Sequence, residues 1–302
     1  MLMLVENQLI FQIIGYFLLF ISGAFIGSFL NVVSDRIISK ESILFGRSHC
    51  TFCNKILGAL ELVPVFSFLI QKGKCLTCRE KLSYYYPFSE ILTGLLFVWS
   101  AYFNGVFTSA SNLTWISFIY LTVVGCVYIV LLLTDLKYQI LPNRIIYPAI
   151  AFVLLYSIGT AAYFMYAFYQ SLSADAFGKY LLEAGYFNQQ LAATSMYFAQ
   201  VLVSTIGIGL FFWILFKITK GRGMGGGDIR LVVLIGLFNG FPNNVIAIII
   251  GFLSGALFSI IMVLLRQRKM KDTIPFGPFL ILGSILSLIF GQQLLSTYLN
   301  LL

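Results

Sequence analysis

Two of the 11 acidic residues border apolar segments of the kind that cross membranes. Asp135 directly follows an apolar run that ends at Thr134, and Asp228 follows the glycine-rich run 223–227 and opens another apolar segment. Ionisable groups at the ends of membrane spans are costly to bury, so they suggest a function or a partner. The alternative is that each carboxylate reaches headgroup water, and either aspartate taken alone favours that alternative.

Considered as a pair, Asp135 and Asp228 predict aspartic-protease chemistry. The glycine-rich run lets the backbone beside Asp228 approach other groups closely because no side chains intervene. Two carboxylates a few ångströms apart cannot both ionise easily, so they share one proton. The ionised member can then take a proton from water while the protonated member polarises a carbonyl group. His49 is the only histidine, which gives a Ser-His triad little support and excludes a metalloprotease histidine pair.

Four of the five cysteines form two Cys-x-x-Cys pairs, Cys50 with Cys53 and Cys75 with Cys78. Two such pairs supply a complete four-sulfur shell for a structural zinc ion, although the 21 intervening residues slightly exceed the usual zinc-ribbon spacing. A redox role and the absence of any role are the weaker alternatives. A loop of about 50 residues has too little apolar surface to fold alone, so zinc would stabilise it. We call residues 34–85 the cysteine loop.

The composition is that of an integral membrane protein. Hydrophobic residues make up 60% of the chain and charged residues 10%, whereas soluble domains carry about 25% charged residues. The net charge of +8 fits contact with anionic lipid headgroups. No recognisable nucleic-acid-binding module accompanies this charge, so we expect no nucleic-acid partner.

The apolar pattern predicts an all-α fold with about eight transmembrane helices and a small zinc-binding loop. The predicted spans, with edges defined to within several residues, are 9–33, 86–104, 115–134, 145–168, 197–216, 229–241, 245–265 and 276–298. We therefore divide the chain into a first span (1–33), the cysteine loop (34–85) and a seven-span core (86–302). The loop 169–196 is equally consistent with a surface amphipathic helix and with a solvated linker.

The basic residues predict how the chain is oriented. Of 19 Lys and Arg residues, all but Lys179 lie in the loops 34–85, 135–144, 217–230 and 266–275. Eight crossings place these four loops on one face, which the positive-inside rule identifies as the cytoplasm. Both termini are then outside, and Asp135, Asp228 and the four paired cysteines lie at the cytoplasmic face.

These residues resemble the type IV prepilin peptidases, bacterial membrane aspartyl proteases with a GxGD signature. The resemblance covers most of the chain, in the family's order, except 157–200. It rests on Gly27-Ser-Phe-Leu-Asn-Val-Val33, the two Cys-x-x-Cys pairs, Tyr86-Pro-Phe-Ser-Glu90, Asp135 with Leu141-Pro142, Gly225-Gly226-Gly227-Asp228 with 229–231, and Ile274-Pro-Phe-Gly-Pro278.

The resemblance implies an enzyme of the bacterial cytoplasmic membrane that removes the leader from prepilins or pseudopilins at the cytoplasmic face. It also implies methylation of the new N-terminus with S-adenosylmethionine, an activity associated with the cysteine loop. Glu61 and Gly73 are the candidate residues for the methyl donor. Asn143 stands where many relatives have Asp, and Leu60 where many have Trp; the second departure weakens the methylation inference.

Three other functions stay open from the sequence. A peptidase without methyltransferase activity would share every motif named above. A proton-coupled transporter is disfavoured because it would place charges near the membrane midplane and show an internal repeat. A structural scaffold with a zinc loop would lose only stability when either aspartate is replaced.

Overall fold

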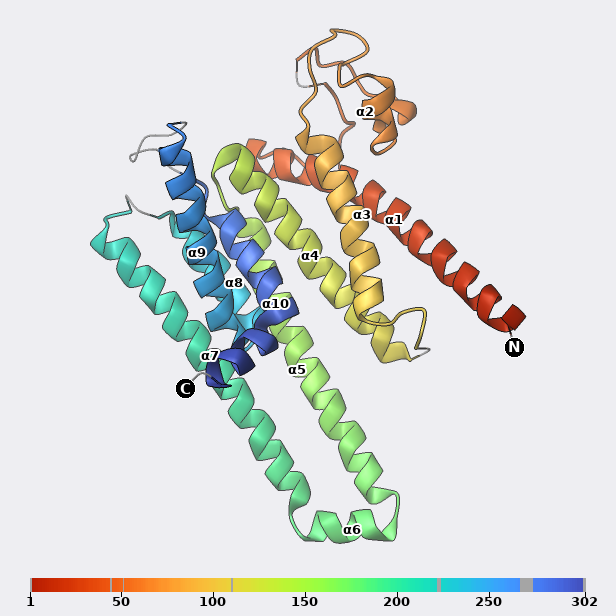
Figure 1. Ribbon diagram of the computed structural model, residues 1–302, viewed down its shortest axis with the longest axis vertical. Coiled ribbons are helices and arrows are strands. Elements are labelled where there is room, and N and C mark those ends of the chain that lie inside the picture. Colours follow the sequence, from red (N-terminus) through yellow and green to blue (C-terminus); the bar gives the residue numbers. More distant parts are fainter. Residues whose placement is uncertain are drawn as a thin grey trace. The chain divides into compact units, whose positions relative to one another are not determined.

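The computed structural model describes residues 2–43, 45–50, 52–109, 111–221, 224–266 and 274–300, with the backbone alone for residues 2–7 (Figure 1). These residues form α-helices, one short 3-10 helix and two isolated β-bridges, and they contain no β-strand. The fold class predicted from the sequence is confirmed.

Eight long helices occur where the eight spans are predicted. They are α1 (Leu2–Ser39), α3 (Tyr85–Phe103), α4 (Asn112–Tyr138), α5 (Asn143–Ser173), α7 (Tyr186–Ile218), α8 (Gly226–Asn239), α9 (Asn243–Leu264) and α10 (Gly277–Asn300). By length and composition, six of them can cross a membrane, all except α3 and α8. The 14 residues of α8 span only about 21 Å, less than a hydrocarbon core of about 30 Å.

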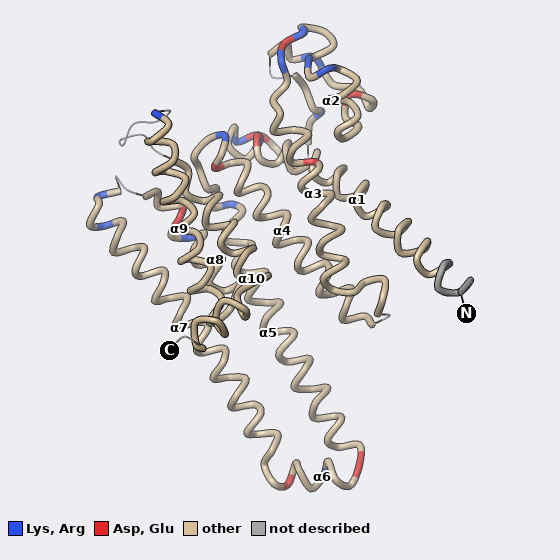
Figure 2. The backbone as a smooth tube through the Cα atoms, in the orientation of Figure 1, with Lys and Arg blue, Asp and Glu red and all other residues tan. Residues whose placement is uncertain are grey.

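Three short helices lie in the loops: η1 (Ala59–Leu62), α2 (Phe66–Ile70) and α6 (Ala176–Glu183). The side chain of Asp175 caps α6 by accepting a hydrogen bond from the Gly178 N–H at 2.7 Å. Acidic residues lie at both ends of α6, which joins the far ends of α5 and α7 (Figure 2). The loop 169–196 therefore contains a short helix, as the first of the two alternatives predicts, between the end of α5 and the start of α7.

The chain folds into two compact units, residues 1–138 and 139–302. The first unit contains α1 to α4 together with the cysteine loop, and the second contains α5 to α10. The division into 1–33, 34–85 and 86–302 follows hydropathy instead, and it stays a prediction.

In the first unit, α1 and α3 pack with their backbones close together. A Cβ atom at Gly23 would lie 2.8 Å from the Thr93 carbonyl oxygen, and one at Gly27 would lie 2.8 Å from the Cα atom of Glu90. Small residues four positions apart let membrane helices approach in this way. On the other side of α3, the Ser100 hydroxyl donates to the Phe118 carbonyl of α4 at 3.2 Å.

In the second unit, α8 is the enclosed element. Its residues Leu231, Val232, Leu234 and Ile235 have no exposed surface, and α5, α7, α9 and α10 all pack against it. At its end, Asn239 donates to the Ser284 carbonyl of α10 at 2.9 Å. A buried hydrogen bond of this kind fixes helix register within an apolar environment. The surrounding helices thus shield α8, which is itself too short to span the hydrocarbon core.

Candidate active site and metal centre

Asp135 lies near the C-terminal end of α4 and is only 5% exposed. The residues that precede it, Leu131, Leu133 and Thr134, are completely buried. The Thr134 hydroxyl donates to the Leu131 carbonyl at 3.1 Å, so the polar side chain beside Asp135 is satisfied within its own helix. The first unit therefore presents a buried carboxylate at a helix end.

A second carboxylate lies at the same end of the first unit. Asp35, in the last turns of α1, accepts hydrogen bonds from the Lys137 ammonium group at 2.9 Å and from the Tyr138 hydroxyl at 3.0 Å. The Lys137 ammonium also lies 5.0 Å from the centre of the Tyr86 ring. The sequence alone does not reveal this cluster, because its members are far apart along the chain and only the fold brings them together.

Asp228 occupies the first turn of α8 and is 7% exposed. Its Oδ2 atom accepts a hydrogen bond from the Gly225 N–H at 3.1 Å, which satisfies one of the free donors at the helix start. A carboxylate in this turn also lies where the helix dipole favours negative charge. The second unit therefore places an anchored carboxylate at the start of its most buried helix.

Within the glycine-rich run, Gly227 makes the close approach that the sequence suggests. A Cβ atom there would lie 2.8 Å from the Cβ of Leu141. Arg230, one turn into α8, donates to the side-chain oxygen of Asn143, the first residue of α5. The start of α8 is thus fixed against the segment 141–143. Gly223, the first residue of the run, lies outside the described residues.

Asp135 belongs to the first unit and Asp228 to the second. That the two carboxylates face each other stays a prediction.

The four paired cysteines come together in the cysteine loop. The Sγ atoms of Cys50, Cys53, Cys75 and Cys78 all lie within 4.8 Å of one another. Those of Cys50 and Cys78 are 3.9 Å apart, close to the separation of about 3.8 Å that Zn–S bonds of about 2.3 Å give in a tetrahedron. The donor set and its spacing therefore fit a structural zinc ion.

The two cysteine pairs have the same backbone geometry. The Cys50 N–H donates to the Lys55 carbonyl, and the Cys75 N–H donates to the Glu80 carbonyl, both at 2.9 Å. Isolated bridges, His49 with Ile56 and Lys74 with Lys81, flank the pairs. N–H groups of Cys78 and Thr77 lower the pKa of the Cys75 thiol to about 7. For Cys78, the Glu80 N–H lowers the pKa, but burial and the neighbouring cysteines outweigh it and raise the pKa to about 11, so the pKa values by themselves do not argue for zinc.

Glu61 is bound within the cysteine loop. Its carboxylate accepts the Gly58 N–H at 2.8 Å and the Lys55 ammonium at 3.0 Å. These two donors, the N–H first, hold the pKa of Glu61 below its usual value. Because both carboxylate oxygens have partners inside the loop, the contacts of Glu61 shape the loop itself.

Gly73 adopts φ +67°, a conformation that L side chains rarely adopt. Its N–H donates to the Phe68 carbonyl at 2.9 Å, and its carbonyl accepts the Leu82 N–H at 2.8 Å. The two candidate residues for the methyl donor, Glu61 and Gly73, therefore both have a clear structural role in the loop.

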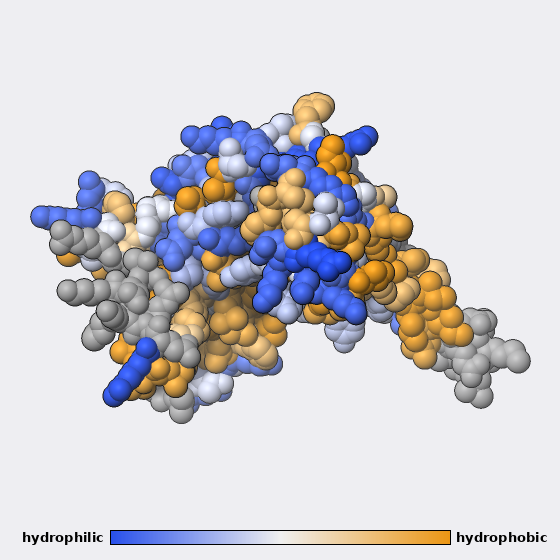
Figure 3. Space-filling model, turned by 90° about the horizontal axis from the view of Figure 1, so that it is seen from above, coloured by the Kyte–Doolittle hydropathy of each residue, from blue (hydrophilic) through white to orange (hydrophobic). Residues whose placement is uncertain are grey.

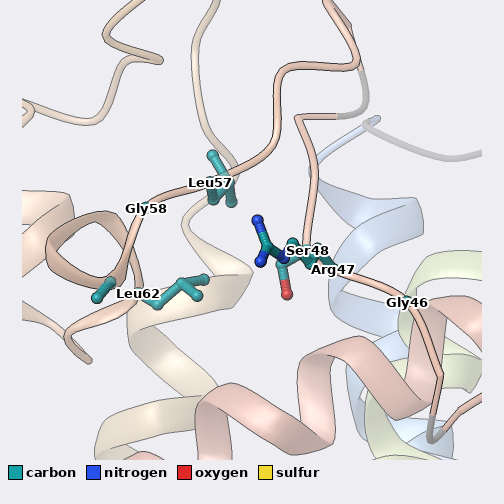
Figure 4. Close-up of a pocket in the computed structure, with 7 residues that line it drawn as sticks. Gly46, Arg47, Ser48, Leu57, Gly58 and Leu62 are labelled. Atoms are coloured by element: carbon teal, nitrogen blue, oxygen red, sulfur yellow. The ribbon is translucent and has the colours of Figure 1, made fainter.

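A hollow of about 490 Å³ lies beside η1 in the cysteine loop. The Arg47 side chain extends from segment 46–48 toward the segment that carries Leu57 and Leu62 (Figure 4). The Gly58 backbone, which Glu61 holds, forms part of the wall. This hollow combines a cation, a hydroxyl and apolar side chains.

Glu90, in the second turn of α3, is 7% exposed and accepts the Val65 N–H at 2.7 Å. Val65 has φ +61°, which is rare for a β-branched residue. In the sequence, Glu90 belongs to the motif Tyr86-Pro-Phe-Ser-Glu90 of the family resemblance. The sequence does not indicate that the partner of Glu90 is Val65 of the cysteine loop.

Two family models match the chain. Residues 21–103 match the bacterial peptidase A24 N-terminal domain, and residues 122–260 match the type IV leader peptidase family. The first range contains the four paired cysteines and the second contains both aspartates.

Curated proteins named "Prepilin leader peptidase/N-methyltransferase" are similar over nearly the full length. The protein from Bacillus subtilis (strain 168) is 30% identical over 284 residues, covering 94% of this chain and 98% of the relative. The proteins from Aeromonas salmonicida (strain A449) and Pseudomonas aeruginosa are 29% and 26% identical, over 94% and 92% of this chain and 93% and 91% of theirs. No solved structure matches significantly.

Proposed function

The chain belongs to the type IV leader peptidase family, and we propose that it removes the leader peptide from type IV prepilins or pseudopilins, with Asp135 and Asp228 as the catalytic pair. The single observation that carries the residue assignment is their burial. Both carboxylates sit at helix ends with only 5% and 7% of their surface exposed. Two buried carboxylates at helix ends are typical of groups kept for chemistry.

In the proposed mechanism, the two carboxylates share one proton. The ionised carboxylate takes a proton from a water molecule, and the resulting hydroxide attacks the carbonyl carbon of the scissile peptide bond. The protonated carboxylate donates a hydrogen bond to the carbonyl oxygen as negative charge develops there. The C–N bond then breaks, and the leaving amine receives a proton from the carboxyl pair.

We place the reaction at the cytoplasmic face of a bacterial cytoplasmic membrane. Within the second unit, basic residues lie near the C-terminal ends of α7 and α9, at the end opposite α6 (Figure 2). The positive-inside rule makes the basic end cytoplasmic, and the loop that leads from α7 into Asp228 is at that end.

The second proposed activity is methylation of the new N-terminus. S-adenosylmethionine would supply the methyl group, and the hollow beside η1 is its candidate site in the cysteine loop. Glu61 would act there by holding the backbone of Gly58, which forms part of the wall of the hollow. Gly73 would act by adopting the positive φ that the turn after α2 requires. The zinc ion would hold the two cysteine pairs, and hence the hollow, in one conformation.

The proposal is tested by co-expressing the chain with a candidate prepilin and measuring the intact mass of the pilin. Asp135→Asn and Asp228→Asn are expected to leave the leader attached. Asp175→Asn is the matched control, because asparagine still caps α6. Equal cleavage by all four proteins would contradict the assignment, and a cleaved but unmethylated product would identify a peptidase without methyltransferase activity.

A further inference from the structure

The short helix α2 of the cysteine loop exposes most of its apolar surface. Phe66, Leu69 and Ile70 are 67%, 64% and 78% exposed. Only Phe68 turns inward, where its ring lies 5.5 Å from the ring of Tyr84. Removing three large apolar side chains from water is strongly favourable, so a surface of this kind indicates an apolar partner.

Two interactions attach α2 to the beginning of α3, the helix that packs along the candidate membrane span α1. The Val65 N–H, just before α2, donates to Glu90 at 2.7 Å, and Phe68 packs on Tyr84, the residue that precedes α3. The helix α2 therefore lies beside the first turns of α3. Glu90 in turn lies against Gly27 of α1, close to the end of the predicted span 9–33, so α2 lies near the end of a helix that can cross a membrane.

The aromatic residues at the start of α3 are a second, independent observation that favours a position near the membrane surface. Tyr84 and Phe88 are 80% and 51% exposed, and together with Tyr85 and Ser83 they line a largely apolar hollow. Tyr and Trp side chains are enriched where membrane proteins meet the headgroup region. The exposed face of α2 and this aromatic group thus lie together beside the first turns of α3.

The charges of the cysteine loop indicate which apolar partner fits the exposed face of α2. Lys72 and Lys74 follow α2 and are exposed, and the loop as a whole has eight basic and four acidic residues. On the face seen in Figure 3, on which the cysteine loop lies, hydrophilic and hydrophobic residues are side by side. An apolar face bordered by cations suits an anionic lipid surface and repels a basic peptide.

We propose that the cysteine loop docks on the bilayer through α2, with Phe66, Leu69 and Ile70 inserted among anionic lipids and Lys72 and Lys74 at their headgroups. The loop is thereby held at the membrane surface instead of moving freely in the cytoplasm. This docking concerns the position of the loop and does not depend on the identity of the catalytic residues.

The test uses the full chain in nanodiscs made of phosphatidylcholine with or without phosphatidylglycerol. A photoreactive benzoylphenylalanine replaces Phe66 or Ile70, and the same amino acid at Phe68 is the matched control on the inward side of α2. After irradiation, mass spectrometry identifies whether the labelled peptide carries a lipid or is linked to protein. Zinc content and leader cleavage verify that each variant is folded.

We expect lipid adducts at positions 66 and 70, a higher yield with phosphatidylglycerol, and links to protein at position 68. Replacing Lys72 and Lys74 by Gln should reduce the phosphatidylglycerol-dependent part of the yield about two- to fivefold. Equal lipid yield at all three positions, or no lipid adduct at 66 and 70, would overturn the proposal. Adducts only to an added prepilin would assign the face to a protein partner and would also overturn it.

Discussion

The ammonium group of Lys137 lies 2.9 Å from Oδ1 of Asp35, a residue 102 positions earlier in the chain. This ion pair joins the C-terminal end of α4 to that of α1. Lys137 is two positions after Asp135, and helix positions two apart do not face each other. The ion pair with Asp35 therefore keeps the ammonium group of Lys137 on a different side of α4 from the carboxylate of Asp135.

Replacing Asp35 by Asn should destabilise the first unit. The pair is largely enclosed, with side-chain exposures of 12% for Lys137 and 28% for Asp35. Loss of a hydrogen-bonded charge partner in such a place costs about 1–3 kcal/mol. Thermal unfolding in detergent should show a lower midpoint for Asp35→Asn and no shift for Asp175→Asn. Equal midpoints would mean that the pair contributes nothing to stability.

Gly227 and Gly226 offer a matched pair of substitutions at the start of α8. A Cβ at Gly227 would lie 2.8 Å from Leu141, whereas at Gly226 the nearest atom would be 4.0 Å away. Gly227→Ala should therefore cost about 1–3 kcal/mol through overpacking and should reduce leader cleavage. Gly226→Ala should keep wild-type stability and cleavage. If both variants cleave equally well, the close approach of Gly227 is not required.

The cysteine cluster should contain one zinc ion per chain. Elemental analysis of the purified protein should find zinc in the wild type and none in Cys75→Ser. Cys126→Ser, which changes the one cysteine outside the two pairs, should keep its zinc. Because a loop of about 50 residues has too little apolar surface to fold alone, hydrogen exchange in residues 45–82 should accelerate when the metal is removed. Retained zinc in Cys75→Ser would contradict four-sulfur coordination.

The pKa of Glu61 predicts how the loop responds to acid. The Gly58 N–H and the Lys55 ammonium favour the ionised form and lower the pKa of Glu61. The folded pKa lies below the unfolded one, so this contribution is complete above the unfolded pKa and is lost as pH falls through the folded pKa. At pH 7, Glu61→Gln should increase hydrogen exchange in residues 55–62, and Glu80→Gln should not. The hydrogen exchange of residues 55–62 in the wild type should match that in Glu61→Gln only in acid.

The sequence predicts where the long helices lie but not where they end. The first predicted span stops at residue 33 because Asp35 and Arg36 follow, yet α1 continues to Ser39. Arg36 is 8% exposed, and its guanidinium donates to the carbonyl oxygens of residues 42, 45, 46 and 47. A hydropathy pattern registers the charge but cannot register the carbonyl groups that satisfy it.

The residues of the candidate site also differ in how far local sequence patterns can predict them. Cysteines three positions apart are close in any fold, so their spacing alone predicts a shared site. Asp135 and Asp228 stay a prediction, which rests on two carboxylates that border apolar runs at the same predicted membrane face. Asp35, Lys137 and the hydrogen bond from Val65 to Glu90 depend on which helices pack together, and this information is absent from local patterns.

Glu90 should control whether α2 stays attached to α3. Its carboxylate accepts the N–H of Val65, whose positive-φ conformation persists only while its surroundings enforce it. Glu90→Leu removes the acceptor, so it should release residues 63–72 and increase their hydrogen exchange. Glu90→Gln keeps an acceptor oxygen and should retain most of the protection.

Val65→Gly distinguishes strain from the hydrogen bond itself. Glycine adopts positive φ without a steric penalty, so this variant should keep the protection of residues 63–72 in spite of its lost side chain. In the Glu90→Leu background, the glycine should not restore protection, because the N–H still has no acceptor on α3. Full protection in Glu90→Leu alone would show that packing of Phe68 on Tyr84 is sufficient to hold α2 at the start of α3.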